Sequence, residues 1–341
     1  MNLTFYKNQE VKVYSLANQF TKLNCSNFGA KILTIEIVDK NNSSLDITAG
    51  YDTIEEYIGG NPAYGALCGR YANRIAKGKF ILNGKSYQCD QNNGAHCLHG
   101  GSDSLFKSMW DVIEVTENAI HFRTTMNDGH MGFPANIVIN YKISVEQTSI
   151  LLEYAVESDG DTVINLAPHS YFNLNGQGTV LNHLLQINAD CITPIDSSCI
   201  PTGEYQFVDS SPFDFRTLKR IGQDINHENE QLAFGKAYDH NFVLNKKDPS
   251  ELAAILIGDQ SNLKMKIYTS QPGLQLYTCN WNTSKIEIGR NKQNYTRHSF
   301  VCLEPQHYPD SPNHSHFPTT ILRKNERYSH FTKYEFEFLN S

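Results

Sequence analysis

Short runs of apolar and β-branched residues, bounded by Gly, Asn, Asp or Pro, recur along the whole chain. Runs of this kind are typical of β-strands. The strands that they predict are Val11–Leu16, Thr21–Cys25, Lys31–Val38, Ser44–Thr48, Lys79–Leu82, Lys85–Cys89, Trp110–Thr116, Ile120–Thr125, Ala135–Val145, Ser149–Val156, Leu184–Ala189, Ala254–Ile257, Leu263–Thr269, Leu274–Cys279, Ser299–Leu303 and Tyr328–Leu339.

Few segments of the chain carry a helical pattern. Only Thr53–Tyr57 and Leu218–Asn226 suggest short helices. The clearest hairpin has the pair Asn83-Gly84 between two predicted strands, which favours a two-residue turn with both residues at positive φ. So many strands with so few helices predict an all-β fold of two large packed sheets. Because nothing resembles a linker or a repeat, we expect one domain spanning residues 1–341.

Composition excludes several classes of partner. The chain has 341 residues, 40% of them hydrophobic, and a net charge of −7, which argues against binding to nucleic acid or to an anionic membrane. It shows neither a signal peptide nor an apolar run that could span a bilayer. The eight cysteines are scattered without a C-x-x-C pair, so we expect free thiols and a cytoplasmic protein.

The stretch Asn165–Leu174 places His169 directly after Pro168, at the end of a β-prone run. Proline cannot donate to a sheet ladder, so we expect Pro168 to interrupt the strand and to leave the imidazole facing a cleft. A pKa near ~6.5 would let this side chain give or take a proton at neutral pH. The alternative is a half-buried histidine with a purely structural role.

Two segments of the N-terminal half offer further polar groups. Arg70, Asn73 and Arg74 follow an apolar run and provide hydrogen-bond donors for a hydroxyl-rich ligand or an anion, although a solvated loop would look the same. His96 and His99 precede a Gly-Gly pair, which permits close backbone approach. The two histidines alone are a weak metal signal, because no further ligand follows at a familiar spacing.

The C-terminal half adds two carboxylates and an amide on predicted strands. Asp239 begins an apolar run, and Gln275 lies on a strand face together with Tyr277. Glu304 ends an apolar run and is followed by Pro305, which we expect to end the strand. Partial burial would raise the pKa of this carboxylate and make it a stronger base. A zinc site could also be built from the last group of polar residues, although a solvated loop fits that spacing better: His307, Asp310, His314 and His316.

Taken in order, these stretches resemble the motifs of the aldose 1-epimerases, also called galactose mutarotases. The resemblance runs almost end to end, through N-R-I, L-H-G-G, H-S-Y-F-N-L, D-H-N-F, Q-P-G-L-Q-L-Y-T and L-E-P-Q-H-Y-P-D. Two places depart from the family pattern. Ser102–Phe106 replaces a glycine and an aromatic residue, and Ala167-Pro168 replaces the usual Thr-Asn before the histidine.

The resemblance implies a β-supersandwich of two large, mostly antiparallel sheets with a cleft for one sugar ring. By motif, Glu304 is the general base, His169 the general acid, and His99 polarises the sugar near its ring oxygen. Asn73, Arg74, Asp239 and Gln275 are implied to bind hydroxyls. No cofactor or metal is implied, and the expected partner is a free sugar such as galactose or glucose, bound by a monomer or homodimer.

Anomer interconversion itself requires one base and one acid. A proton must leave the C1 hydroxyl while another reaches the ring oxygen, after which the open chain rotates and the same groups work in reverse. Burial of Glu304 and a partner for His169 are expected to bring their pKa values together. Three alternatives remain at this point: a hexose-6-phosphate epimerase using Arg70 and Arg74, a non-catalytic sugar-binding module, and a glycosidase using Asp239 and Glu304.

Overall fold

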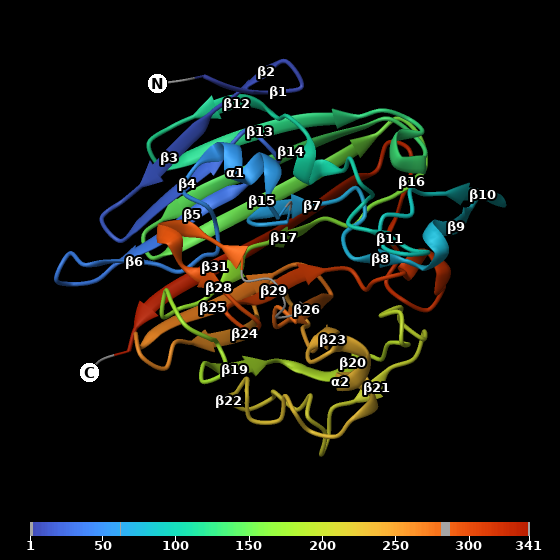
Figure 1. Cartoon of the computed structure of the whole chain (residues 1–341). Helices are drawn as coiled ribbons and strands as arrows, with labels where there is room; N and C mark the ends of the chain where they lie inside the picture. The colour runs from blue at the N-terminus through green and yellow to red at the C-terminus, as the bar shows by residue number, and fades with distance from the viewer. Residues whose placement is uncertain (1–2, 62, 281–286, 340–341) are drawn as a thin grey trace.

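The largest element of the fold is a nine-stranded antiparallel sheet. The structure, a computed structural model, describes residues 3–61, 63–280 and 287–339. In Figure 1 the sheet runs from green strands at the top through the red C-terminal strand to orange strands below. Its strands, in spatial order, are β12 (Asp111–Val115), β13 (Ala119–Met126), β14 (Ile137–Glu146), β15 (Ser149–Ser158), β31 (Arg327–Phe338), β25 (Leu263–Thr269), β24 (Leu252–Ile257), β19 (Leu184–Ile187) and β22 (Lys219–Arg220).

A six-stranded antiparallel sheet carries most of the polar residues singled out above. The register sets Gln275 opposite Glu304, and Asp239 opposite Tyr277. Its strands, in spatial order, are β18 (Tyr171–Phe172), β29 (Val301–Gln306), β26 (Gly273–Tyr277), β23 (Asp239–Leu244), β20 (Ala189–Thr193) and β21 (Gln206–Phe207).

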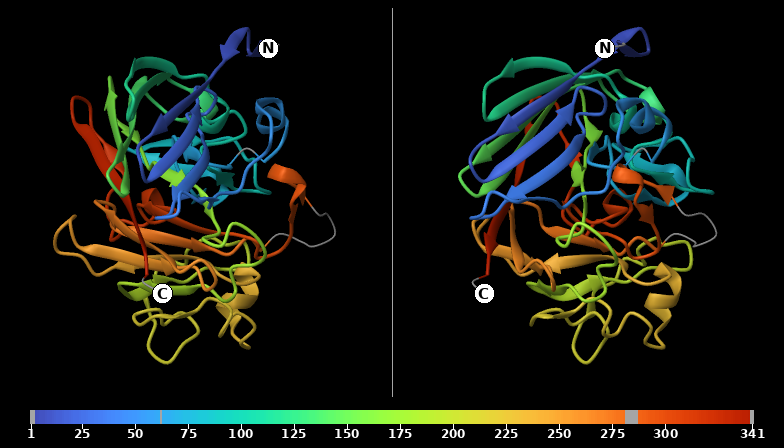
Figure 2. Two further views of the ribbon diagram at one scale, coloured as in Figure 1. Left: turned by 90° about the vertical axis from the view of Figure 1, so that its left-hand side faces the viewer. Right: turned by 60° about the vertical axis from the view of Figure 1, so that its left-hand side comes forward.

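A four-stranded sheet near the N-terminus lies beside strands β13–β15, as Figure 2 shows for the blue and green ribbons. Its strands are β3 (Val13–Ala17), β4 (Thr21–Ser26), β5 (Ile32–Val38) and β6 (Ser44–Asp46). Two-stranded pairs complete the described strands: β1 (Thr4–Tyr6) with β2 (Gln9–Val11), β7 (Ala66–Cys68) with β17 (Ala167–His169), β8 (Arg74–Ile75) with β11 (Cys97–Leu98), β9 (Lys79–Leu82) with β10 (Lys85–Gln88), β16 (Thr162–Val163) with β30 (Ile321–Leu322), and β27 (Glu287–Ile288) with β28 (Asn294–Tyr295).

The large sheets share one hydrophobic core. Leu23 and Ile35 of the four-stranded sheet belong to the same buried cluster as Ile139 of the nine-stranded sheet. The ring of Phe172 on β18 lies edge-on to Tyr334 on β31, with 5.2 Å between the centroids. Aromatic pairs in this geometry add about 0.5–1.5 kcal/mol beyond the burial of their surface. The all-β prediction is therefore confirmed.

Local sequence signals explain the best-predicted elements. Asn83 and Gly84 have φ angles of 52° and 77°, as the predicted two-residue turn of the β9–β10 hairpin requires. The helix predicted at Thr53–Tyr57 is confirmed as α1 (Ile54–Gly59). Thr53 is its N-cap and forms a capping box with Glu56, which satisfies backbone donors at the start of the helix.

The helix predicted at Leu218–Asn226 is wrong. Lys219 and Arg220 form strand β22 at the edge of the nine-stranded sheet, because pairing with β19 outweighs the local pattern. The helix of this region is α2 (Glu230–Gly235), a few residues later, where the side chain of Asn229 caps the first turn. No helix in the described residues is long and apolar enough to cross a membrane.

The expectation that proline ends two strands is also wrong. Pro168 sits inside β17 opposite Leu67, and Pro305 sits inside β29 opposite Leu274. A proline is tolerated in a strand where its nitrogen needs no ladder partner. β18 pairs only with the first two residues of β29, so that side of the strand is free of a ladder partner at Pro305.

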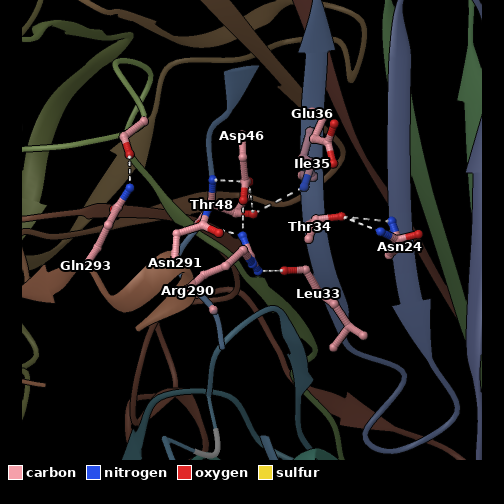
Figure 3. Close-up of polar contacts among 12 residues, drawn as sticks. Asn24, Leu33, Thr34, Ile35, Glu36, Asp46, Thr48, Arg290, Asn291 and Gln293 are labelled. Carbon is pink, nitrogen blue, oxygen red and sulfur yellow. Dashed lines mark hydrogen bonds and ion pairs between the residues drawn. The ribbon is translucent and has the colours of Figure 1, made fainter. Parts of the chain in front are cut away.

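Arg290 fastens the segment after β27 to the four-stranded sheet (Figure 3). Its guanidinium is ion-paired with Asp46 and donates to the carbonyl oxygen of Leu33. It also donates to the hydroxyl of Tyr57 at 2.9 Å. Since the arginine side chain is only 13% exposed, these contacts fix the segment firmly against β5 and β6.

Candidate active site

A cavity of about 330 Å³ opens where strands β29, β17 and β23 approach the β8–β11 pair. Six of the residues predicted from sequence line it: Asn73, Arg74, His99, His169, Asp239 and Glu304. The remaining lining residues are Asn61, Ala63, Asn92, Leu98, Phe106, Tyr171 and Tyr277. The fold thus brings together side chains that lie up to about 230 positions apart in the sequence.

Glu304 and His169 face each other in the base of this cavity. The Nε2 atom of His169 lies 3.4 Å from Oε2 of Glu304, and the side chains are 4% and 3% exposed. Each comes from a strand whose backbone is held by its neighbour, since β29 pairs with β26 and β17 pairs with β7. This gives the pair a rigid frame, which positioned proton transfer requires.

Burial moves the pKa values of the two groups in opposite directions. It raises the pKa of Glu304 well above its usual range, and the charge of Asp239 adds to this effect. It lowers the pKa of His169 to about 4. The expected rise for Glu304 is confirmed, whereas the expected support of His169 by a partner is outweighed by burial. Burial therefore favours the uncharged form of each group, a carboxylic acid and a neutral imidazole.

The backbone fixes the tautomer of His99. Its Nδ1 atom accepts the backbone N–H of Asn73 at 3.2 Å, and the backbone N–H of His99 donates to the carbonyl of Asn73 at 3.0 Å. Burial, with the nearby His169 and Arg74, lowers the pKa of His99 well below its usual value. A neutral imidazole that accepts at Nδ1 carries its proton on Nε2. His99 is therefore a hydrogen-bond donor.

Arg74, Asp239 and Gln275 form a chain of polar contacts on one wall. The guanidinium of Arg74 lies 3.5 Å from the carboxylate of Asp239, and both side chains are 14% exposed. Gln275 does not line the cavity but stands behind Asp239, donating from Nε2 to Oδ1 at 2.6 Å. A carboxylate and a guanidinium held side by side offer both acceptors and donors to a polyhydroxylated ligand.

Aromatic side chains that the sequence did not single out complete the walls. The ring of Tyr171 stacks on the imidazole of His169, with centroids 4.9 Å apart. Tyr171 lies two residues after His169, so strand alternation could have identified it. Phe106 lies within the segment that departs from the family pattern and supplies an aromatic face to the cavity. Asn61 and Asn92 come from loops, whose sequences have no hydrophobic periodicity that could have placed these side chains at the cavity.

Several candidate groups do not join the site. Arg70 is fully buried and donates to the carbonyls of Pro134 and Ala135, so its proposed role as a ligand donor is wrong. His96 accepts the backbone N–H of Lys77 in a loop. In the described part of the chain, His307, Asp310, His314 and His316 do not form a group of three or more potential metal ligands.

Comparison with known proteins agrees with the architecture of this site. A family model described as aldose 1-epimerase matches residues 12–335. Galactose mutarotase of Bos taurus is 34% identical over 328 residues, covering 96% of this chain and 94% of the relative. Aldose 1-epimerase of Haemophilus influenzae is 37% identical over 295 residues, covering 84% and 83%. An aldose epimerase homologue from C. elegans superposes with a TM-score of 0.89 at 28% identity, covering 97% of this chain and all of the other.

The chain therefore belongs to the aldose 1-epimerase family. As a member of that family it is an isomerase. Mutarotation is the function that its relatives support. These findings favour the isomerase over the glycosidase and over the non-catalytic sugar-binding module.

Proposed function

We propose that the protein interconverts the α and β anomers of a free aldohexose, such as galactose or glucose, and that Glu304 and His169 transfer the protons. The observation that carries this proposal is the buried contact of 3.4 Å between these two side chains at the base of a sugar-sized cavity. Two titratable groups whose pKa values burial drives in opposite directions are typical of an acid–base pair.

The pair already contains the proton that catalysis needs. In the ligand-free site this proton rests on Glu304, because burial favours the protonated carboxylic acid. Its transfer to His169 across the short contact generates a carboxylate base and an imidazolium acid without uptake from solvent. Glu304 then removes the proton of the C1 hydroxyl while His169 protonates the ring oxygen. After rotation about C1–C2 the two groups reverse their roles and the ring closes as the other anomer.

The other polar groups orient the sugar. His99 donates from Nε2 toward the ring oxygen, which becomes more negative as the ring opens. Asp239 and Arg74 bind hydroxyls on the far side of the ring, with Gln275 holding Asp239 in place. Asn73 stabilises His99 through its backbone and adds an amide to the wall.

The charges of the cavity support a free sugar over a hexose 6-phosphate. Arg74 is the only lysine or arginine among the described lining residues, and Asp239 already neutralises it. Arg70, the second cation that a phosphate site would have used, is occupied by backbone carbonyls elsewhere. A dianionic phosphate would therefore lack a matching cation.

Polarimetry of freshly dissolved α-D-galactose and α-D-glucose tests this function. Purified protein should bring the optical rotation to equilibrium faster than buffer alone, and hexose 6-phosphate should compete poorly. An unchanged rate with both free sugars would refute the proposal.

A further inference from the structure

A third potential metal ligand lies beside the proton-transfer pair. Cys302 and Glu304 are two residues apart on β29 and point to the same face of the strand, toward His169. One ligand atom from each of these three residues lies within 4.8 Å of the other two. In the described part of the chain, Oε2 of Glu304, the oxygen that faces Nε2 of His169, has no hydrogen-bond partner with good geometry.

The spacing fits a tetrahedral cation. Metal–nitrogen and metal–oxygen bonds of roughly 2.0–2.2 Å at the tetrahedral angle place two such ligands about 3.3–3.5 Å apart. The observed distance between His169 and Glu304 is 3.4 Å. A sulfur ligand needs a separation of roughly 3.6 Å from each of the other two ligand atoms. The sulfur of Cys302 lies within 4.8 Å of both, so each separation would have to shorten by about 1.2 Å at most.

The charges also fit. A divalent cation deprotonates a thiol and a carboxylic acid that it binds, and the resulting thiolate and carboxylate cancel its charge. A metal-bound imidazole is uncharged, so His169 adds no charge to the complex. The complex would therefore be neutral, which a buried location requires.

An ion has a route to this position. Glu304 and His169 line the cavity, whereas Cys302 is fully buried behind them. Three protein ligands leave a fourth position open toward the cavity, as in zinc sites that hold water or a substrate. An ion there would occupy the lone pairs that proton transfer uses.

A second group, Cys68 with His99 and His169, is equally close but less suited. Nδ1 of His99 already accepts the N–H of Asn73, so Nε2 carries a proton and has no lone pair for a metal. A metal ion could bind there only if His99 gave up this hydrogen bond or changed its tautomer.

We propose that Cys302, His169 and Glu304 form a binding site for a thiophilic divalent cation, Zn²⁺ or Cd²⁺, which inhibits the enzyme. The inhibition rests on the proton-transfer roles proposed above, whereas binding of the ion does not. The expected state is one ion per chain, reversed by a chelator.

Two cysteine variants distinguish the Cys302 site from the alternative site at Cys68. Cys302→Ala should leave turnover without metal unchanged and should raise the half-inhibitory concentration of Zn²⁺ and Cd²⁺ at least ~10-fold, the lower end of what disturbing a metal's surroundings costs. Cys68→Ala is the matched control, a buried thiol beside the same histidine, and should be inhibited like the unaltered protein. Equal inhibition of all three proteins, or loss of inhibition only in Cys68→Ala, would overturn the assignment.

Direct binding of Cd²⁺ supplies a readout that does not depend on activity. The ultraviolet absorption of a cadmium–thiolate bond should appear with one equivalent of Cd²⁺, persist in Cys68→Ala and weaken in Glu304→Gln. This comparison remains decisive if Cys302→Ala does not fold. If the unaltered protein binds no Cd²⁺ at millimolar concentrations, the site does not exist, whatever its mutarotase rate. If it binds Cd²⁺ but shows no mutarotation without metal, only the proposed function fails.

Discussion

Replacing Asp239 by asparagine should separate sugar binding from proton transfer. The carboxylate accepts from Gln275 at Oδ1 and faces the guanidinium of Arg74 at Oδ2. Asparagine keeps an acceptor for Gln275 but turns its NH₂ group toward Arg74, so two donors meet and the ion pair is lost. One charge-assisted hydrogen bond contributes about 1.5–3 kcal/mol, which corresponds to roughly 10- to 150-fold in binding.

The expected result is therefore a rise of KM by roughly 10- to 150-fold with a much smaller change in kcat. The charge of Asp239 also raises the pKa of Glu304, so its removal should move the alkaline limb of the pH profile to lower pH. Initial polarimetric rates over a range of galactose concentrations and pH values measure both effects.

A matched control is Asp209→Asn, since Asp209 is 62% exposed and pairs with Arg216 outside the cavity. It should leave KM and the pH profile unchanged. If Asp239→Asn has the KM of the unaltered protein, or lowers only kcat, Asp239 does not bind the sugar and the reasoning about this wall is wrong.

Three further changes probe the supports of the site. The side chain of Asp310 accepts the backbone N–H of Ala76 at 2.9 Å, and its backbone N–H donates to the carbonyl of Arg74. Asp310→Ala should therefore raise KM by up to ~100-fold in initial-rate assays, and far less in an Arg74→Ala background. Equal effects in both backgrounds would contradict the role of Asp310 in positioning Arg74. Arg290→Met leaves the half-buried Asp46 without its ion-pair partner and should lower the free energy of unfolding by about 1.5–3 kcal/mol in denaturant titrations. An unchanged midpoint would contradict the role of Arg290 in fastening this segment. Because burial lowers the pKa of His169 to about 4, kcat/KM should fall on the acid side near pH 4; a limb near the ordinary value of ~6.5 would show that the imidazole is not desolvated.

Local chemistry made much of the fold predictable. The Asn83-Gly84 turn and the Thr53 cap depend on neighbours in sequence, so their signals are complete in the sequence itself. The helix expected at Leu218–Asn226 failed because its fate is decided by pairing with β19, a strand about 35 residues earlier. A short edge strand formed by pairing of this kind has no hydrophobic periodicity of its own by which the sequence would reveal it.

The catalytic candidates could be named from motifs, but their environment could not. Sequence reasoning placed Arg70 beside Arg74 as a second ligand donor, whereas the chain turns Arg70 into the interior to satisfy the carbonyls of Pro134 and Ala135. It also missed Asn61 and Asn92, which reach the cavity from loops whose paths depend on tertiary contacts. The direction of the pKa shift of His169 likewise follows from its burial, which only the assembled fold reveals.

The central claim is that Glu304 and His169 transfer protons to and from one sugar ring. Its most direct test is the polarimetric turnover of Glu304→Gln and His169→Asn at saturating galactose, with folding verified by circular dichroism. Each variant should lose at least ~10²-fold in kcat, since each removes one positioned proton-transfer group. A near-normal kcat for Glu304→Gln would contradict the account.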